Sequence, residues 1–78
     1  MKQKVLFYHA GCPVCQDAER AVLELLDPAR FEVEVIHLGQ QKDRLGEAER
    51  LGVQSVPALV VNNRVFHINF GAKLTDLK

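Results

Sequence analysis

The chain lacks tryptophan, has one methionine and two cysteines, and carries no net charge, because ten basic and ten acidic residues cancel. A protein that binds nucleic acid through its phosphates needs a basic excess, so this class is not expected. No apolar run approaches the roughly 20 residues that span a membrane, and the N-terminal apolar stretch is too short for a signal peptide. We therefore expect a cytoplasmic monomer with no nucleic-acid and no membrane partner.

The scarcity of cysteine also excludes a secreted mini-protein, which is usually held together by about two to four disulfides. The two cysteines are Cys12 and Cys15. A disulfide between them closes a small loop and constrains the unfolded chain little. In a cytoplasmic chain, such a pair is more typical of chemistry than of structural support.

What is present fits a single domain over residues 1–78, with 47% hydrophobic and 26% charged residues. Residues 5–8 form a continuous apolar run before Gly11, which is typical of a strand buried on both faces. Pro13 suits the first turn of a helix. From there to residue 25, apolar side chains recur on one helical face, and Asp27 and Pro28 end the pattern.

The second half of the chain contains shorter segments bounded by turn residues. The elements expected there are an edge strand over 31–35, a weak helix over about 42–51 ending at Gly52, a buried strand over 58–61, a turn at Asn62 and Asn63, a returning strand over 65–68, and a short helix over 72–77 after Gly71. A strand–helix–strand unit gives a parallel pair, and the closing hairpin adds an antiparallel one.

The sequence therefore predicts an α/β fold of order β-α-β-α-β-β-α, with a four-stranded mixed sheet and the two continuous apolar runs at its centre. Tyr8 is expected to pack against the sheet, and the glutamates over 31–35 to form a solvated face. The aromatic residues expected in the core are Phe7, Phe31, Phe66 and Phe70.

The cysteines differ in their expected surroundings. Cys12 stands at the start of the first helix, where unpaired amides and the helix dipole favour its thiolate, the form that attacks a disulfide. Cys15 follows one turn later on the apolar face, so it is expected to be more buried and to resolve the mixed disulfide. Pro13 stiffens the turn, and Val14 leaves the site uncharged. His9 either tunes the Cys12 thiolate when protonated or is a loop residue without a role.

Two other interpretations of the same cysteines remain open. One is a metal-binding module in which His9 joins Cys12 and Cys15, although zinc prefers four ligands and the chain has no second cysteine pair. We expect His37 and His67 to be surface residues that do not converge on the cysteines. The other is a redox-sensing module, in which the disulfide switches the binding of a partner.

Three segments resemble the thioredoxin-fold superfamily: residues 11–15 after a buried strand, residues 51–59, which are similar to the segment that carries its cis-proline, and residues 70–72, where members have a glycine beside the active site. The resemblance implies a redox-active thiol–disulfide oxidoreductase that reduces protein disulfides, with Cys12 nucleophilic, Cys15 resolving and the Val56-Pro57 bond cis. That bond would aim the backbone of Val56 at an extended substrate.

The substrate surface and electron donor follow from the same resemblance. The residues expected to bind a disulfide-containing protein or peptide are Pro13, Val14, Val56, Pro57, Phe70 and Gly71, with an apolar rim formed by Val14, Val56 and Phe70. No cofactor is expected, and the electron donor is a reductase or glutathione. The Cys-Pro-x-Cys motif is similar to glutaredoxins, so a glutathione-coupled enzyme is the alternative. Leu6 stands where thioredoxins bury an aspartate.

Overall fold

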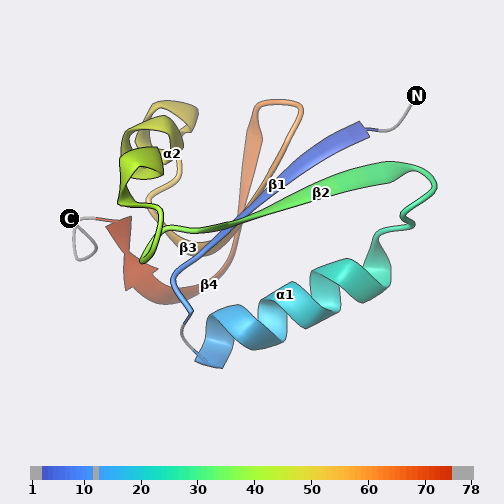
Figure 1. The fold of residues 1–78 in the computed structure, drawn as a ribbon, viewed down its shortest axis with the longest axis horizontal. Coiled ribbons are helices and arrows are strands. Elements are labelled where there is room, and N and C mark those ends of the chain that lie inside the picture. The colour runs from blue at the N-terminus through green and yellow to red at the C-terminus, as the bar shows by residue number, and fades with distance from the viewer. Residues whose placement is uncertain (1–2, 12, 75–78) are drawn as a thin grey trace.

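A computed structural model describes residues 3–11 and 13–74 of the chain (Figure 1). The elements in order are β1 (Gln3–His9), α1 (Pro13–Leu25), β2 (Phe31–His37), a 3-10 turn (Lys42–Arg44), α2 (Leu45–Leu51), β3 (Ser55–Val61) and β4 (Arg64–Lys73). Within these residues, no helix has the length and apolar character needed to cross a membrane.

The four strands form one sheet in the order β2-β1-β3-β4. β1 and β2 are parallel, whereas β1 with β3 and β3 with β4 are antiparallel. This arrangement confirms the α/β fold with a mixed sheet, and it confirms that the two continuous apolar runs occupy the centre. α1 and α2 lie on opposite sides of the sheet (Figure 1).

β1 supplies residues to a separate core on each face of the sheet, because successive side chains of a strand point to opposite faces. Phe7 is fully buried in a cluster with Ala18 and Val22 of α1. Tyr8 is fully buried in a larger cluster that includes Leu45 and Ala48 at α2. The two helices are therefore held to the sheet through one shared strand.

Two predictions about left-handed backbone are confirmed. Asn62 and Asn63 have φ of 52° and 63° and connect β3 to β4, as expected for a tight hairpin in which both central residues need positive φ. Gly52 follows α2 with φ of 101°, and its backbone N–H bonds to the carbonyls of Ala48 and Glu49. This is a glycine that ends a helix and satisfies its last carbonyl groups.

The C-terminal part of the sheet differs from the prediction. The prediction is a short helix over 72–77 after a break at Gly71, but β4 continues through Lys73 and the helical assignment begins only at Leu74. The register shifts opposite Pro57, so that Ala58 pairs with His67 while Val56 pairs with Ala72. Pro57 has no N–H to donate to the hydrogen-bond ladder between β3 and β4. This explains why the pairing is irregular between Val56 and Ala58, although β4 itself continues. Residues 75–77 of the expected helix lie outside the described residues.

The expected aromatic core is only partly correct. Phe7 is fully buried and Phe31 is partly buried, but Phe66 is 54% exposed. Phe66 pairs with Leu59, so it lies on the α1 face of the sheet. It remains exposed because β4 is the edge strand and none of the described elements covers that part of the face. The side chain of Phe70 lies outside the described part of the chain.

We expect Phe7→Ala to lower the free energy of unfolding by about 3–5 kcal/mol, because it leaves a cavity between β1 and α1. Leu25→Ala is the matched control, since Leu25 is 82% exposed and its loss should cost less than about 0.5 kcal/mol. Urea unfolding followed by circular dichroism measures both. Equal losses for the two variants would contradict the assignment of Phe7 to the core.

Candidate functional site

The segment that connects β1 to α1 holds the first expected site residue. β1 ends at His9 and α1 begins at Pro13. Cys12 lies outside the described residues, so the site is defined by the residues around it. Cys15 is fully buried in the first turns of α1, as its place on the apolar face predicts. The roles of nucleophile and resolving thiol stay predictions.

The Val56-Pro57 peptide bond is cis, as the family resemblance implies. Both residues are fully buried, and Val56 shares a cluster with Cys15. The Val56 side chain therefore packs in the core and cannot form part of an exposed apolar rim, which corrects that expectation. The backbone of Val56 pairs with Ala72 of β4, and the residue as a whole has no exposed surface.

The other expected substrate-binding residues are Pro13, Val14, Phe70 and Gly71, and the structure describes them only in part. Pro13 is exposed at the start of α1. Phe70 and Gly71 belong to the part of β4 that runs opposite Pro57, and the side chains of Phe70 and Val14 are outside the described part. The sheet thus places the backbone of residues 70–71 beside the cis-proline.

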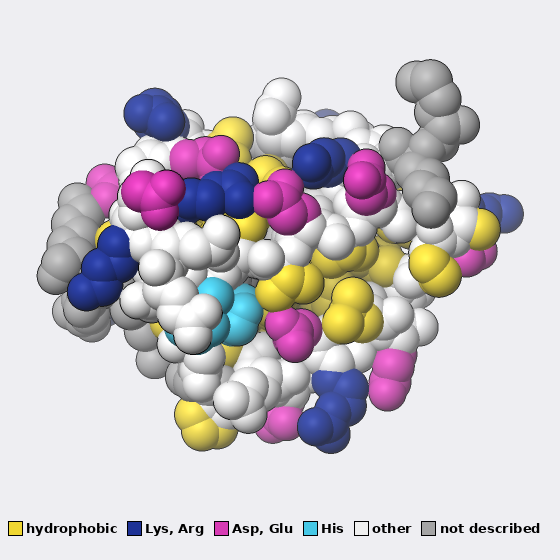
Figure 2. Space-filling model, in the orientation of Figure 1, with side chains coloured by type: hydrophobic (Ala, Val, Ile, Leu, Met, Phe, Trp, Pro, Cys, Tyr) yellow, Lys and Arg dark blue, Asp and Glu magenta, His cyan; other side chains and the backbone are white. Residues whose placement is uncertain are grey.

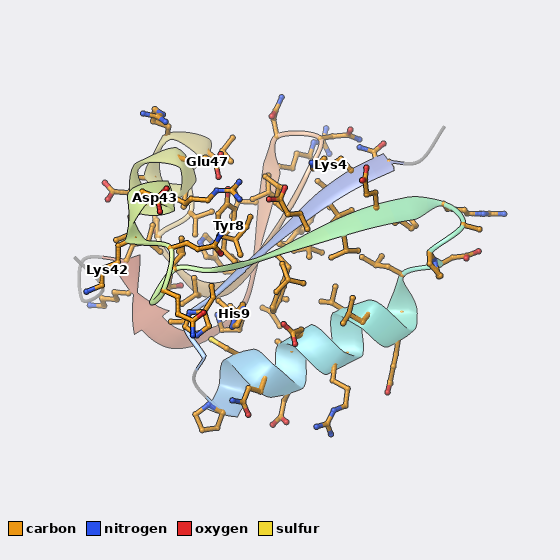
Figure 3. The ribbon with its side chains drawn as sticks, viewed as in Figure 1. Lys4, Tyr8, His9, Lys42, Asp43 and Glu47 are labelled. Carbon is orange, nitrogen blue, oxygen red and sulfur yellow. The ribbon has the colours of Figure 1, made fainter. Side chains whose placement is uncertain are left out.

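His9 lies at the end of β1 (Figure 3) and is not a loop histidine. It is buried, with 8% of its surface exposed. Its ring stacks on Phe7 at 5.7 Å, and its Nδ1 accepts the N–H of Gly11 at 3.1 Å. Its Nε2, which must carry the proton in the neutral ring, faces Glu19 at 3.7 Å. Burial lowers the pKa of His9, the neighbouring His37 lowers it further, and Glu19 opposes both.

His37 lies against His9, which sequence reasoning missed. The two ring centroids are 4.7 Å apart with a tilt of 58°, and histidine side chains gather at one place on the surface in Figure 2. The prediction that His37 does not converge on the cysteine segment is therefore wrong. Its cause is the parallel pairing of β1 and β2, in which His9 and His37 are register partners. Each histidine ends its strand, so this signal was present in the sequence.

Gly11 is fixed by three neighbours. It has φ of +78°, which favours glycine. Its N–H is held by His9, and its carbonyl accepts a hydrogen bond from Gln16 Nε2 at 3.3 Å. A Cβ at this position would lie 2.6 Å from Nε2 of His37. The backbone that leads into Cys12 is thus packed directly against the imidazole of His37.

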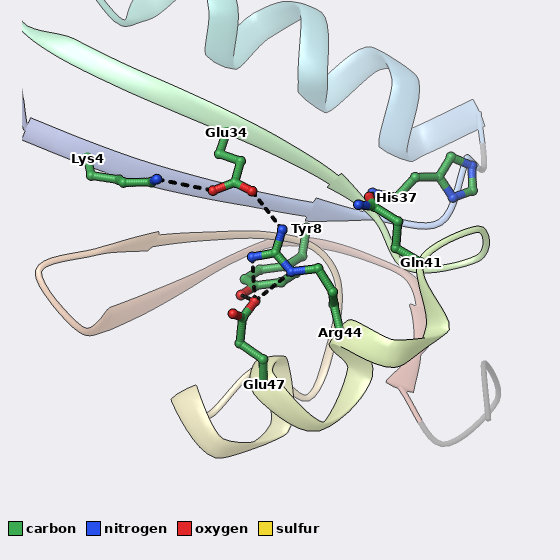
Figure 4. Close-up of polar contacts among 7 residues, drawn as sticks. All are labelled: Lys4, Tyr8, Glu34, His37, Gln41, Arg44 and Glu47. Carbon is green, nitrogen blue, oxygen red and sulfur yellow. Dashed lines mark hydrogen bonds and ion pairs between the residues drawn. The ribbon is translucent and has the colours of Figure 1, made fainter.

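A second polar group lies on the α2 side of the sheet (Figure 4). Arg44 contacts Glu34 at 2.6 Å and Glu47 at 2.7 Å, and Lys4 contacts Glu34 at 3.2 Å. Figure 2 shows the resulting row of alternating basic and acidic side chains. Glu34 is therefore part of an ion-pair network and not simply a solvated side chain, because β2 lies beside the 3-10 turn that carries Arg44.

Tyr8 connects this network to the core. Its hydroxyl donates a hydrogen bond to Glu47 Oε2 at 2.8 Å. Burial raises the pKa of Tyr8, and the bond to Glu47 raises it further. The same bond is the main cause of the lowered pKa of Glu47. The expectation that Tyr8 packs is confirmed, and the network joins α2 to β1 and β2.

The metal interpretation receives no support from the described residues. Among them, no group of three histidine, cysteine, aspartate or glutamate side chains could hold a metal ion. The interpretation also needs Cys12, which these residues do not include. His67 is exposed on the edge strand, as expected, and its Nε2 accepts the N–H of Gln54 at 3.1 Å.

Comparison with known proteins agrees with the fold. A family model described as a thioredoxin domain matches residues 1–69. No curated protein matches the chain. The solution NMR structure of the dimeric thioredoxin-like protein NE0084 from Nitrosomonas europea is similar, with 56% identity, a TM-score of 0.91, and coverage of 99% of this chain and 96% of that chain. The dimeric state of that protein is at odds with the monomer expected from sequence.

The lowered pKa of His9 predicts a pH-dependent stability. The folded state takes up the His9 proton less readily than the unfolded state, so stability present above about pH 6.5 falls as the pH drops through that value. We expect His9→Asn, whose amide can still accept the Gly11 N–H, to lose less stability than the wild type between about pH 8 and pH 5. Urea unfolding across this range measures it, and identical slopes would contradict the analysis.

Proposed function

The chain belongs to the thioredoxin family, and from this premise we propose that it is a thiol–disulfide oxidoreductase that reduces protein disulfides through Cys12 and Cys15 in the cytoplasm. One observation carries the proposal. Cys15, buried at the start of α1, shares a core cluster with Val56, whose bond to Pro57 is cis. The proposed resolving cysteine therefore packs beside the cis Val56-Pro57 bond, the segment that the family resemblance assigns to substrate binding.

The reaction consists of two exchanges. The Cys12 thiolate attacks one sulfur of the substrate disulfide, a new S–S bond forms, and the second substrate sulfur leaves as a thiolate. Cys15 then loses its proton and attacks the Cys12 sulfur, which releases the first substrate sulfur. The substrate gains two electrons, its thiolates take up protons from water, and Cys12 and Cys15 become a disulfide. A reductase or glutathione returns the two electrons.

The surroundings of His9 favour a protein substrate over a glutathione-coupled reaction. His9 stands where many glutaredoxins have a lysine near the glutathione carboxylate. Here the side chain is buried, its Nδ1 is occupied by the Gly11 N–H, and its Nε2 faces Glu19. Because burial and His37 lower its pKa, His9 is poorly suited to offer a positive charge to a carboxylate at neutral pH.

The two cysteines should respond differently to substitution. We expect Cys12→Ser to reduce a protein disulfide no faster than the background reaction, because it has no attacking thiolate. Cys15→Ser should accumulate mixed disulfides, since nothing resolves them. Non-reducing gels and mass spectrometry identify the trapped species, with the double variant as control. The assigned roles would be contradicted by a Cys12→Ser variant that still reduces the substrate, or by a Cys15→Ser variant that forms no mixed disulfide.

We also infer that two copies of this chain associate through the exposed apolar side chains of β4, Phe66 and Ile68. The similar protein NE0084 is described as dimeric. Phe66 and Ile68 of β4 are 54% and 43% exposed, and they stand two residues apart on one strand. A two-fold interface brings the same patch of both copies together, so each copy would cover the apolar side chains of the other.

Phe66→Asp tests this face, because it places a charge at the centre of the expected contact. We expect the variant to elute as a monomer at concentrations where the wild type is a dimer, as measured by light scattering after size exclusion. Leu23→Asp is the matched control, since Leu23 is 51% exposed on α1. A wild-type monomer would contradict the association, and dissociation of the Leu23→Asp variant alone would place the interface elsewhere.

A further inference from the structure

The sheet has two edge strands, β2 and β4, and the edge of β2 is capped at both ends. The backbone N–H of Phe31 donates to the carbonyl of Asp27 at 2.8 Å. At the other end, the N–H of His37 donates to Oε1 of Gln41 at 3.0 Å, and the His37 carbonyl accepts the N–H of Gln41 at 2.7 Å. An added strand would find backbone groups on β2 only between these caps, and natural edge strands are protected in such ways.

The outer edge of β4 presents its backbone differently. The two-residue turn over 62–63 makes the flanking pair, Val61 and Arg64, a hydrogen-bonded pair, and the pairs beyond it alternate between bonded and non-bonded. Phe66 therefore bonds to β3, whereas the N–H and C=O of Val65 point away from β3. These outward groups of Val65 are directed at the space in which another strand would lie.

The side chains along this edge are apolar on the face that α1 covers only in part. Phe66 is 54% exposed and Ile68 is 43% exposed. Phe66 pairs with Leu59, which packs against the cluster under α1. β2 instead carries Glu32 and Glu34 between its caps. Exposed apolar side chains beside outward backbone groups make β4 the edge suited to another chain.

A second copy of this chain is the partner that these observations favour. The similar protein NE0084, 56% identical over 99% of this chain, is described as dimeric. A two-fold axis brings a surface patch against the same patch of the other copy, and an apolar strand edge is its own complement in that arrangement. The chain carries no net charge, so two copies do not repel each other through their net charge.

We propose that two copies pair their β4 strands antiparallel across a two-fold axis at Phe66, so that two four-stranded sheets become one continuous sheet. The axis places Phe66 opposite itself. Because its backbone bonds to β3, this is a non-hydrogen-bonded pair, in which Cα atoms are about 4.5 Å apart and the side chains are closest. Aromatic pairs at such positions stabilise a sheet, and the outward groups of Val65 add main-chain bonds between the copies.

This pairing brings the second copy to the proposed substrate surface. Residues that pair across the axis lie equally far from Phe66 in opposite directions, so the turn at Asn62 and Asn63 of one copy lies beside residues 69–70 of the other. In that part of the sheet, β4 runs opposite Pro57. Each copy therefore borders the segment that the family resemblance assigns to substrate binding in the other copy. The inference rests on the association of two copies inferred above, and it is independent of the exchange chemistry.

Disulfide cross-linking tests this register in the Cys12→Ser/Cys15→Ser background, which has no thiol of its own. Each variant adds one cysteine and is oxidised at a concentration where the wild type is a dimer, and non-reducing gels give the cross-linked fraction. A disulfide needs Cα atoms within about 7 Å of each other. We expect Phe66→Cys to form at least about 10-fold more cross-linked dimer than the controls, because only its two Cα atoms meet this limit.

Two exposed residues serve as matched controls. Ile68→Cys lies on the same strand, but its two Cα atoms would be offset by about four residues, or about 13 Å. Val35→Cys lies on the other edge strand, β2, where Val35 is 37% exposed. If circular dichroism shows that the background does not fold, Cys15→Ala replaces Cys15→Ser in all variants.

Hydrogen exchange of the wild-type protein gives a second measurement that needs no added cysteine. The N–H of Val65 points away from β3, so in the proposed dimer the other copy protects it. We expect its exchange to be at least about 10-fold slower in the wild type than in Phe66→Asp. The N–H of Val33 is the control, because Val33 stands two residues after Phe31 on β2 and should exchange at the same rate in both proteins.

Cross-linking of Ile68→Cys that equals or exceeds that of Phe66→Cys would contradict an axis at Phe66, and cross-linking of Val35→Cys alone would place the interface at β2. Equal exchange of the Val65 N–H in the wild type and in Phe66→Asp would contradict strand pairing. Reduction of a protein disulfide by the wild type is measured separately. Its absence together with a Phe66→Cys cross-link would overturn the proposed function and leave the pairing intact, and the reverse pair of results would do the opposite.

Discussion

The burial of β1 on both faces is the constraint on which the rest of the structure depends. Its side chains alternate between the cluster under α1, through Phe7, and the cluster under α2, through Tyr8. A shift of one residue would exchange these two sets, so the register of β1 is strongly specified. Because β1 pairs with both β2 and β3, the same register fixes where each neighbouring strand begins and ends.

The site inherits its geometry from that register. Parallel pairing sets the last residue of β1 opposite the last residue of β2, and both are histidines. Beyond them the chain turns at Gly11, whose positive φ leads toward α1. Antiparallel pairing brings β3, with the cis Val56-Pro57 bond, to the same region, where Val56 and Cys15 share a cluster. The cysteine segment, the histidine pair and the cis-proline therefore meet without any contribution from the ion-pair network around Arg44.

The ion-pair network around Arg44 stabilises the fold and does not contribute to the cysteine site. Tyr8 bonds to Glu47, and Arg44 connects Glu47 to Glu34. These contacts tie α2 to the sheet on the face opposite to α1. Tyr8 is fully buried, and a buried hydroxyl without a hydrogen-bond partner destabilises the fold. Glu47 supplies that partner. The chemistry we propose does not draw on it.

The central strands and the hairpin could be predicted from the sequence, but the extent and the exposure of the edge strand β4 could not. Continuous apolar runs predicted β1 and β3 as central strands, and Asn62 with Asn63 predicted the hairpin. Phe66 was wrongly expected in the core, because composition does not show how far α1 reaches across the sheet. The extension of β4 through Lys73 depends on a register shift opposite Pro57, which is a tertiary feature.

The sequence also shows where the histidines lie along the chain but not how they pack. The position of His9 before Cys12 was readable from the chain, but its burial was not. The sequence shows that His37 is near a strand end, but only the parallel register of β1 and β2 brings it against His9. The cis bond at Val56-Pro57 came from family resemblance, since a local sequence does not determine the isomer of a proline bond.

The most direct test of the central claim is the reduction potential of the Cys12–Cys15 couple, measured by equilibration in glutathione redox buffers and quantified by alkylation and mass spectrometry. The account predicts a disulfide between these two cysteines, with a two-electron potential between about −270 mV and about −120 mV, the range of proteins that carry out this exchange. Failure of any Cys12–Cys15 disulfide to form across the buffer series would contradict thiol–disulfide chemistry at this site.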